Sequence, residues 1–228
     1  MNEKELEKIE NEANEWHNKL EDISKTDEVI KNLYRGISIW FSPISENPDI
    51  MFLGINPGAG YYNNNNKNLI HRIKPLTINE YADKNQTYKL KNEWEYIFGN
   101  KENCLNRPDL LEKSVKSNFC YFATEKSSDM KKLFTQMRAN FGIAPYELCG
   151  NWTRRIISEI KPKILICEGK QSFDLLCRWS FQNQFEKDES ILSITRGHIG
   201  PMKIIQISRM RSTLKDAGEI VKQIRKCL

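Results

Sequence analysis

The stretch 49–58, DIMFLGINPG, constrains the fold more than any other part of the chain. A run of mostly apolar residues, followed by a turn rich in glycine and proline, predicts a buried strand that ends abruptly. Because a strand that is apolar on both faces needs cover on both, we expect it at the centre of a parallel sheet. Ligands bind beyond the carboxyl ends of such strands, and Asn56 stands there. An ordinary turn, with Asn chosen for its turn propensity, is the alternative.

Similar patterns predict alternating strands and helices along the rest of the chain. We expect strands at 117–122, 163–169, 191–194 and 202–207, and helices at 129–140, 145–160, 170–179 and 213–227. Strands that alternate with helices of this length imply a parallel sheet between helical layers. The predicted fold class is therefore α/β, a three-layer α/β/α sandwich with a central, mainly parallel sheet. At 228 residues the chain is long enough for one sizeable domain, 1–228.

Apolar residues near the N-terminus are spaced three and four apart, which predicts an amphipathic helix at about 3–32 that packs on its own domain. The stripe consists of Leu6, Ile9, Ala13, Trp16, Leu20 and Ile23. Residues 1–28 hold ten acids and four bases, whereas the remaining 200 residues hold 31 bases and 20 acids. A basic body behind an acidic, separate N-terminal segment suggests a polyanionic partner. Lysines scattered over a solvated surface are the alternative.

The long stretch 61–108 is polar and basic, and we expect an insertion there, directly after the turn that carries Asn56. Eight Lys and Arg residues lie between 67 and 107, interleaved with aromatic residues. This composition fits contact with nucleic acid, although a solvated loop is the more ordinary explanation. A short packed helix is expected around 94–98.

The cysteine pattern and the hydropathy limit the classes of protein. Six cysteines include no C-x-x-C pair, which argues against a metal site or an iron–sulfur cluster, and we expect no cofactor. Three of them stand in apolar runs, as small buried hydrophobic residues do. The chain shows neither a signal peptide nor a transmembrane run. We therefore expect a cytoplasmic protein with no membrane partner.

Three motifs, in their order along the chain, resemble the uracil-DNA glycosylase superfamily. Residues 54–58, GINPG, are similar to the letter to the first motif of its mismatch-specific uracil/thymine branch. Residues 117–119, SNF, stand at the place of the superfamily's Asn-bearing second strand. Residues 164–173, ILICEGKQSF, resemble its third strand and the helix that follows. The resemblance covers about 50–58 and 117–227, and it implies hydrolysis of the glycosidic bond of an everted nucleotide in DNA.

The resemblance implies that Asn56 holds the attacking water through its carbonyl oxygen. An amide cannot act as a strong base, so such a site depends on orientation and electrostatics. Asn118, at a strand end, can pair with the edge of an everted base, with a turn-capping Asn as the alternative. Tyr61 or Tyr62 can stack on that base, or can pack on the insertion instead. Further base contacts are expected from the turn itself, at Gly54, Pro57 and Gly58.

The last loop departs from the superfamily, which usually carries His-Pro-Ser or Asn-Pro-Ser there. This chain has SRMRST at 208–213, and the missing histidine puts uracil as the substrate in doubt. Arg209 can meet the charge on the leaving base, while His198, between two glycines, is either a substitute histidine or a turn residue. A basic turn before a helix, with Ser212 or Thr213 as N-cap, is the alternative for the loop. The expected DNA contacts are Ser208, Met210 as a wedge, Arg211, Ser212 and Lys170.

Together these features predict a monofunctional DNA glycosylase, a monomer that binds single- or double-stranded DNA and leaves an abasic site. The insertion and the altered last loop suggest a pocket for a damaged or bulky modified base. Modified phage DNA is a candidate substrate, which makes antiviral defence an alternative to DNA repair. A catalytically inert domain of the same fold, which only binds DNA or a protein, is the competing interpretation. The altered last loop favours it, and the intact motif around Asn56 argues against it.

Overall fold

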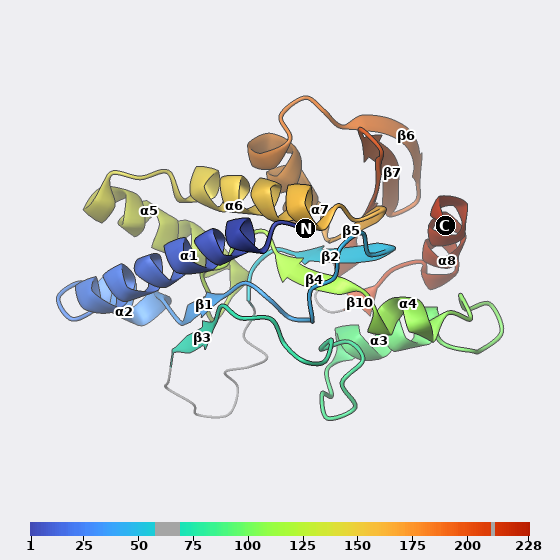
Figure 1. Cartoon of the computed structure of the whole chain (residues 1–228), viewed down its shortest axis with the longest axis horizontal. Helices are drawn as coiled ribbons and strands as arrows, with labels where there is room; N and C mark the ends of the chain where they lie inside the picture. The colour runs from blue at the N-terminus through green and yellow to red at the C-terminus, as the bar shows by residue number, and fades with distance from the viewer. Residues whose placement is uncertain (58–68, 211–212) are drawn as a thin grey trace.

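The computed structural model describes residues 1–57, 69–210 and 213–228 (Figure 1). Its main sheet has six strands in the order β4-β2-β5-β8-β7-β6. The first four strands run parallel to one another, and β7 and β6 extend the sheet as an antiparallel hairpin. The predicted central stretch is confirmed as β2, which lies between β4 and β5 and is buried at every position. The strands are β2 Ile50–Gly54, β4 Val115–Asn118, β5 Ile164–Glu168, β6 Glu186–Ile191, β7 Ile194–Ile199 and β8 Met202–Ile207.

Helices flank the sheet and form a hydrophobic core on each of its faces (Figure 1). Met51 and Leu53 of β2 face one core, which includes residues of α1, α5 and α6. Ile50 and Phe52 face the other, which includes residues of α3, α4 and α8. Successive side chains of a strand point to opposite faces, which is why a continuous apolar run here fills two cores. The helices are α1 Glu3–Ile23, α2 Glu28–Leu33, α3 Lys89–Phe98, α4 Pro108–Glu112, α5 Met130–Phe141, α6 Pro145–Ile160, α7 Lys170–Leu175 and α8 Ala217–Cys227.

The N-terminal segment is two helices, where we expected one, and it packs on the body of the domain as the apolar stripe predicted. The break follows from Asp27, whose carboxylate accepts hydrogen bonds from the backbone N–H groups of Val29 and Ile30 and so caps the start of α2. The acidic residues of α1 serve internal contacts, because Arg155 of α6 forms ion pairs with both Glu5 and Glu12. The predicted apolar stripe is confirmed, with Leu6, Ile9, Ala13 and Leu20 buried and Trp16 and Ile23 packed against the same core.

The described part of the predicted insertion, residues 69–108, is a folded layer of the protein. It contributes α3 and the short strand β3 Ile70–Arg72, which pairs in parallel with β1 Gly36–Ser38, and it ends where α4 begins at Pro108. The short packed helix expected around 94–98 is confirmed as part of α3, and the aromatic residues Tyr81 and Trp94 are fully buried against Phe52 of β2. The stretch is therefore partly packed core, while residues 73–88 form no helix or strand and are mostly exposed or half-buried.

The C-terminal boundaries differ from the predicted ones. The strand expected at 191–194 is the turn between β6 and β7, where Leu192 has φ 53° and is 77% exposed. The pattern of β6 hid it, because this strand is polar and mostly exposed. The last helix begins at Ala217, after β9 Arg209–Met210 pairs with β10 Thr213–Leu214. Thr213 is therefore not the N-cap, which is Asp216. Within the described residues, no helix is long and apolar enough to cross a membrane.

Candidate functional site

Three polar or flexible positions meet where β4, β2 and β5 end. Gly54 of β2 pairs with Asn118 of β4, and Glu168 of β5 lies at the same level on the other side of β2. Paired residues of a parallel sheet point to the same face, so Asn118 and Glu168 flank Gly54 there. A Cβ atom at Gly54 would lie 2.1 Å from Oδ1 of Asn118 and 3.5 Å from Oε2 of Glu168. Because Gly54 has no side chain, the side chains of Asn118 and Glu168 can approach each other over it.

Asn56 follows on the turn, is buried, and has a defined amide orientation. Its Nδ2 donates to the carbonyl oxygen of Pro57 at 3.2 Å and to Oγ1 of Thr124 at 3.0 Å. The Thr124 hydroxyl uses its own proton on the carbonyl oxygen of Lys126, at 2.8 Å. Both partners of Nδ2 therefore act as acceptors, and only the NH₂ end of the amide can face them. Oδ1 of Asn56 is left as the atom that can hold a water or a ligand.

Asn118 is only 6% exposed, yet its side-chain amide makes no hydrogen bond with any residue that the structure describes. The amide has one donor group and one acceptor oxygen, and within the described residues both are left for water or a ligand. Such a group is well placed to bind a ligand that offers both a donor and an acceptor. Asn56 lies beyond the end of β2 as predicted, whereas Asn118 is the last residue of β4, a strand that was expected at 117–122.

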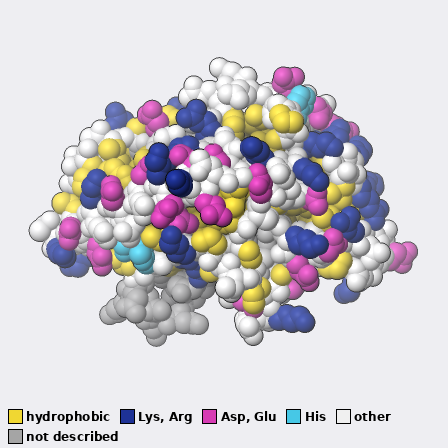
Figure 2. Space-filling view, viewed as in Figure 1, with side chains coloured by type: hydrophobic (Ala, Val, Ile, Leu, Met, Phe, Trp, Pro, Cys, Tyr) yellow, Lys and Arg dark blue, Asp and Glu magenta, His cyan; other side chains and the backbone are white. Residues whose placement is uncertain are grey.

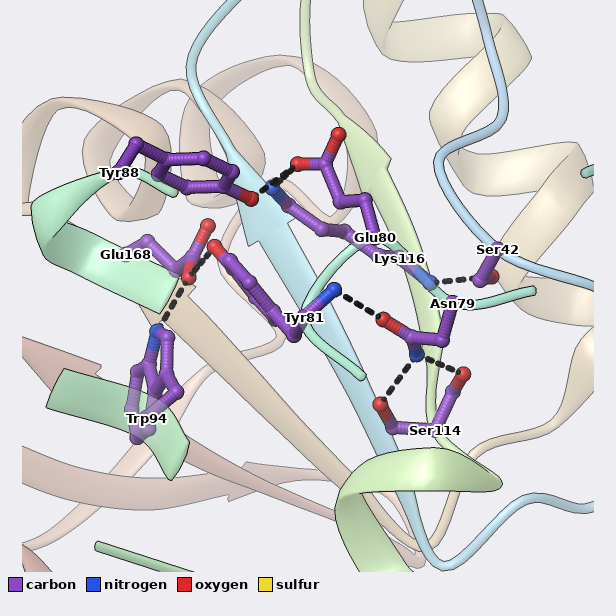
Figure 3. A network of polar contacts seen from close by, with 9 residues as sticks. All are labelled: Ser42, Asn79, Glu80, Tyr81, Tyr88, Trp94, Ser114, Lys116 and Glu168. Carbon is purple, nitrogen blue, oxygen red and sulfur yellow. Dashed lines mark hydrogen bonds and ion pairs between the residues drawn. The ribbon is translucent and has the colours of Figure 1, made fainter. Parts of the chain in front are cut away.

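Glu168 is a site residue that the sequence analysis missed. It is 3% exposed, and its Oε1 accepts hydrogen bonds from the hydroxyl of Tyr81 and, at 2.7 Å, from Nε1 of Trp94 (Figure 3). Both donors come from the layer 69–108, far from Glu168 in the sequence. The available signal was a carboxylate in the last position of a strand that is otherwise apolar, ILICE.

Tyr81 is held from several sides, which makes the Glu168 contact a defined one. Oδ1 of Asn79 accepts a hydrogen bond from the backbone N–H of Tyr81 at 2.9 Å. Its Nδ2 donates to the carbonyl oxygen of Ser114 at 2.7 Å (Figure 3). The ammonium group of Lys116 lies 3.9 Å from the centroid of the Tyr81 ring. Burial, together with the nearby charge of Glu168, raises the pKa of Tyr81 well above its ordinary value. Tyr81 therefore stays a neutral hydroxyl donor at physiological pH.

The cation Lys116 is itself neutralised inside this cluster. Its ammonium group forms an ion pair with Glu80, and the Tyr88 hydroxyl donates to the same Glu80 oxygen at 2.8 Å. Burial and the adjacent Glu80 carboxylate raise the pKa of Tyr88, so that it too remains protonated. Figure 3 shows Tyr81 between the two carboxylates, with its hydroxyl toward Glu168. Glu80 thus binds Lys116 and Tyr88, whereas Glu168 accepts hydrogen bonds from Tyr81 and Trp94.

Arg209 reaches the same end of the sheet. Its Nε lies 3.8 Å from the position that a Cβ of Gly169 would occupy, next to Glu168. The side chain is partly buried, and in the described parts of the chain it has no hydrogen-bond or ion-pair partner. The strand β9 is held in place by its pairing with β10 and by a hydrogen bond from the backbone N–H of Leu214 to Glu93 of α3. Arg209 is thus a cation on an anchored hairpin beside the strand ends.

Some of the other predicted site residues lie in the described part of the chain, and some do not. Ser208 is partly buried and accepts a hydrogen bond from Gln206 at 3.1 Å, and Lys170 is exposed at the start of α7. Pro57 is buried on the turn, where its carbonyl oxygen binds Asn56. Met210 belongs to β9. The predictions for Gly58, Tyr61, Tyr62, Arg211 and Ser212 fall outside the described residues.

None of the three histidines is brought to this site. His198 pairs with Lys203 near the start of β8, at the opposite end of the sheet from Asn56, so it cannot replace the missing histidine of the last loop. It lies within a strand rather than in a turn, and its Nδ1 is 3.2 Å from Asp188. His17 and His71 stack on each other with ring centroids 4.5 Å apart.

A hollow of about 790 Å³ lies elsewhere, lined by residues that include Trp16, Leu148 and Trp179. It shares no residue with the cluster at the strand ends. Among the described residues, no group of three or more His, Cys, Asp or Glu is arranged to hold a metal ion. Comparison with known protein families finds no family that matches this chain, and comparison with curated proteins finds no significant match.

Proposed function

We propose that this protein is a monofunctional DNA glycosylase of the uracil-DNA glycosylase superfamily, with that superfamily's three-layer α/β/α sandwich. The observation that carries the proposal is the orientation of Asn56. Its two amide protons are used by Pro57 and Thr124, so that within the described residues its carbonyl oxygen is left to accept a hydrogen bond from a water. The order of motifs along the chain, GINPG at 54–58 before SNF at 117–119, supports the same assignment.

The proposed reaction needs few groups. One water adds its hydroxyl to C1′ of the sugar, and the C–N bond breaks with its electron pair leaving on the base, which then takes up a proton. Asn56 orients the water and takes no proton, because an amide is not a base at neutral pH. The leaving base carries negative charge in the transition state, and a preorganised donor there lowers the barrier. Arg209, near Gly169 and without another partner in the described chain, is the group proposed for this role.

The proposed partner is DNA with one base turned out of the stack. Lys and Arg side chains are spread over the face seen in Figure 2, and the net charge of the chain is +5. Positive charge on this scale favours binding to the phosphate backbone. A damaged or modified base is the proposed substrate, with modified phage DNA and antiviral defence as the alternative to repair. The protein is proposed to act in the cytoplasm as a monomer.

The test is base release from a panel of duplexes and single strands, read as strand cleavage after alkali treatment of abasic sites. The panel contains ordinary DNA, uracil DNA, 5-hydroxymethylcytosine DNA and its glucosylated form. We expect release from at least one modified member, and loss of that release in Asn56→Ala. A folded protein that binds these DNAs and releases no base from any of them would contradict the proposal.

The second candidate is an inert domain of the same fold that only binds DNA. The observation that favours it is the last loop, in which SRMRST at 208–213 replaces the usual His-Pro-Ser. The same panel separates the two candidates, because an inert domain would give salt-sensitive binding without abasic sites.

A further inference from the structure

Glu168 has one oxygen fixed and one oxygen turned toward the candidate site. Oε1 takes both hydrogen bonds, from Tyr81 and from Trp94, which fixes the plane of the carboxyl group. Oε2 then lies on the side of Gly54, 3.5 Å from the position of a Cβ there. No hydrogen bond to Oε2 is formed within the described residues. A carboxylate oxygen that is turned to a ligand site can accept a hydrogen bond from a donor on that ligand.

The side chain of Asn118, on β4, reaches the same space over Gly54 from the other side of β2. Its Oδ1 lies 2.1 Å from the same Cβ position, so a ligand over Gly54 meets the Glu168 carboxylate and the Asn118 amide together. A carboxylate only accepts hydrogen bonds, whereas an amide both donates and accepts. The combined site thus calls for a ligand edge that carries a donor group toward Glu168.

We propose that Oε2 of Glu168 binds the exocyclic amino group of an everted base, so that the site selects amino-bearing bases of the cytosine type over uracil types. This inference rests on the proposed function and names the substrate class of the same site. Acceptance of a hydrogen bond from the N4 amino group of cytosine is a common role of Glu in base recognition. Uracil presents a carbonyl oxygen at that position, which would place two acceptors against each other and leave Glu168 unpaired.

The experiment compares pairs of substrates that differ only in whether the base is a cytosine or a uracil, which exchanges the 4-amino group for a carbonyl oxygen and the N3 acceptor for an N3–H donor. Cytosine and uracil DNAs are prepared with no 5-substituent, with 5-hydroxymethyl and with glucosylated 5-hydroxymethyl groups. For the wild-type protein we expect faster release from the cytosine member of any pair that is cleaved. Glu168→Gln keeps a carbonyl oxygen for Tyr81 and Trp94 and replaces the free oxygen by an NH₂ donor. It should shift the ratio of the two rates toward the uracil member by about 10- to 100-fold.

The matched control is Glu80→Gln, the same change in the neighbouring carboxylate, which contacts Lys116 and Tyr88. It should leave the ratio of rates unchanged even if it weakens folding. A wild-type preference for the uracil member overturns the inference without any variant. An equal loss of both rates in Glu168→Gln, or an unchanged ratio, overturns it as well, since either result means a general catalytic or structural role. If the wild-type protein releases no base from any pair, the proposed function fails first and this inference falls with it.

Discussion

Nε1 of Trp94 donates a 2.7 Å hydrogen bond to Oε1 of Glu168, although the two residues are 74 positions apart. The bond joins helix α3 to the end of strand β5 and crosses the face of the sheet that α3 covers. The hydroxyl of Tyr81 donates to the same oxygen. The layer 69–108 therefore does two things: it fills one hydrophobic core, and it orients a buried carboxylate at the candidate site.

Tyr81→Phe should lower stability by about 1.5–3 kcal/mol, the range for hydrogen bonds to charged groups. The ring stays in its packing against Phe52, and only the hydroxyl that meets Glu168 is lost. Urea unfolding of the two proteins measures the difference. Tyr96→Phe is the matched control, because Tyr96 is 47% exposed and its loss of a hydroxyl should be nearly neutral. Equal midpoints for Tyr81→Phe and the wild-type protein would contradict the role given to this bond.

Asn56→Ala should reduce base release roughly 10²-fold while leaving DNA affinity nearly unchanged, because a displaced water costs rate more than binding. Single-turnover release and equilibrium binding separate the two quantities. Thr124→Val should cause a smaller loss, since it removes one of the two acceptors that orient the Asn56 amide. Turnover close to normal in Asn56→Ala would remove Asn56 from the mechanism.

Gly54→Ala should reduce base release at least about 10-fold, because a displaced contact near the reacting group is costly to the rate. The new Cβ would stand 2.1 Å from Oδ1 of Asn118, so the amide has to move. The control is Gly218→Ala in α8, where an added Cβ meets no atom within 4 Å. That variant should keep full activity and gain slightly in stability. Full activity in Gly54→Ala would show that the position of the Asn118 amide does not matter.

DNA binding should weaken steeply between about 50 and 200 mM salt, since each phosphate contact releases condensed counterions. Arg209→Ala should flatten the slope of log affinity against log salt by about one if Arg209 contacts a phosphate. If Arg209 meets the leaving base instead, the slope stays and the rate of release falls. Arg178→Ala is the control, because the Arg178 guanidinium lies over Trp179, 5.1 Å from its ring centroid. Affinity that does not respond to salt would argue against DNA as the partner.

Stability should fall on mild acidification because of His17. Burial, with a further contribution from His71, lowers the pKa of His17 below its ordinary value, although Glu21 acts in the opposite direction. The unfolded chain then binds a proton more readily than the folded protein. The contribution of neutral His17 to stability is complete above about pH 6.5, the pKa in the unfolded chain, and is lost as the pH falls through the lower pKa of the folded protein.

Urea midpoints at about pH 7.5 and 5.5 test this pH dependence. We expect a drop in the wild-type protein and a smaller drop in His17→Gln. Because the Tyr34 hydroxyl lies 2.6 Å from Nδ1 of His17, the variant should also be less stable at both pH values. An equal drop in both proteins would assign the acid sensitivity to other groups.

Local patterns were sufficient to predict the strands of the sheet's centre. The apolar runs at β2 and β5, and the turn that follows β2, identify strands covered on both faces and place Asn56 beyond the end of β2. The same reasoning expected a strand at 117–122, whereas β4 is Val115–Asn118, so Asn118 ends a strand that was expected to begin beside it. These predictions depend on side-chain periodicity and on turn residues, which are properties of neighbouring positions.

Tertiary structure alone decided the rest of the site. The role of Glu168 depends on donors from α3 and from the turn at Tyr81. The aromatic residues of that layer are core because they cover the face of β2 that carries Phe52. The register of β7 against β8 carries His198 away from the site, and the pairing of β9 with β10 places Arg209 beside Gly169. Sequence periodicity determines which side chains must be buried, whereas the partner of each buried polar group is set by contacts between distant segments, which no local pattern encodes.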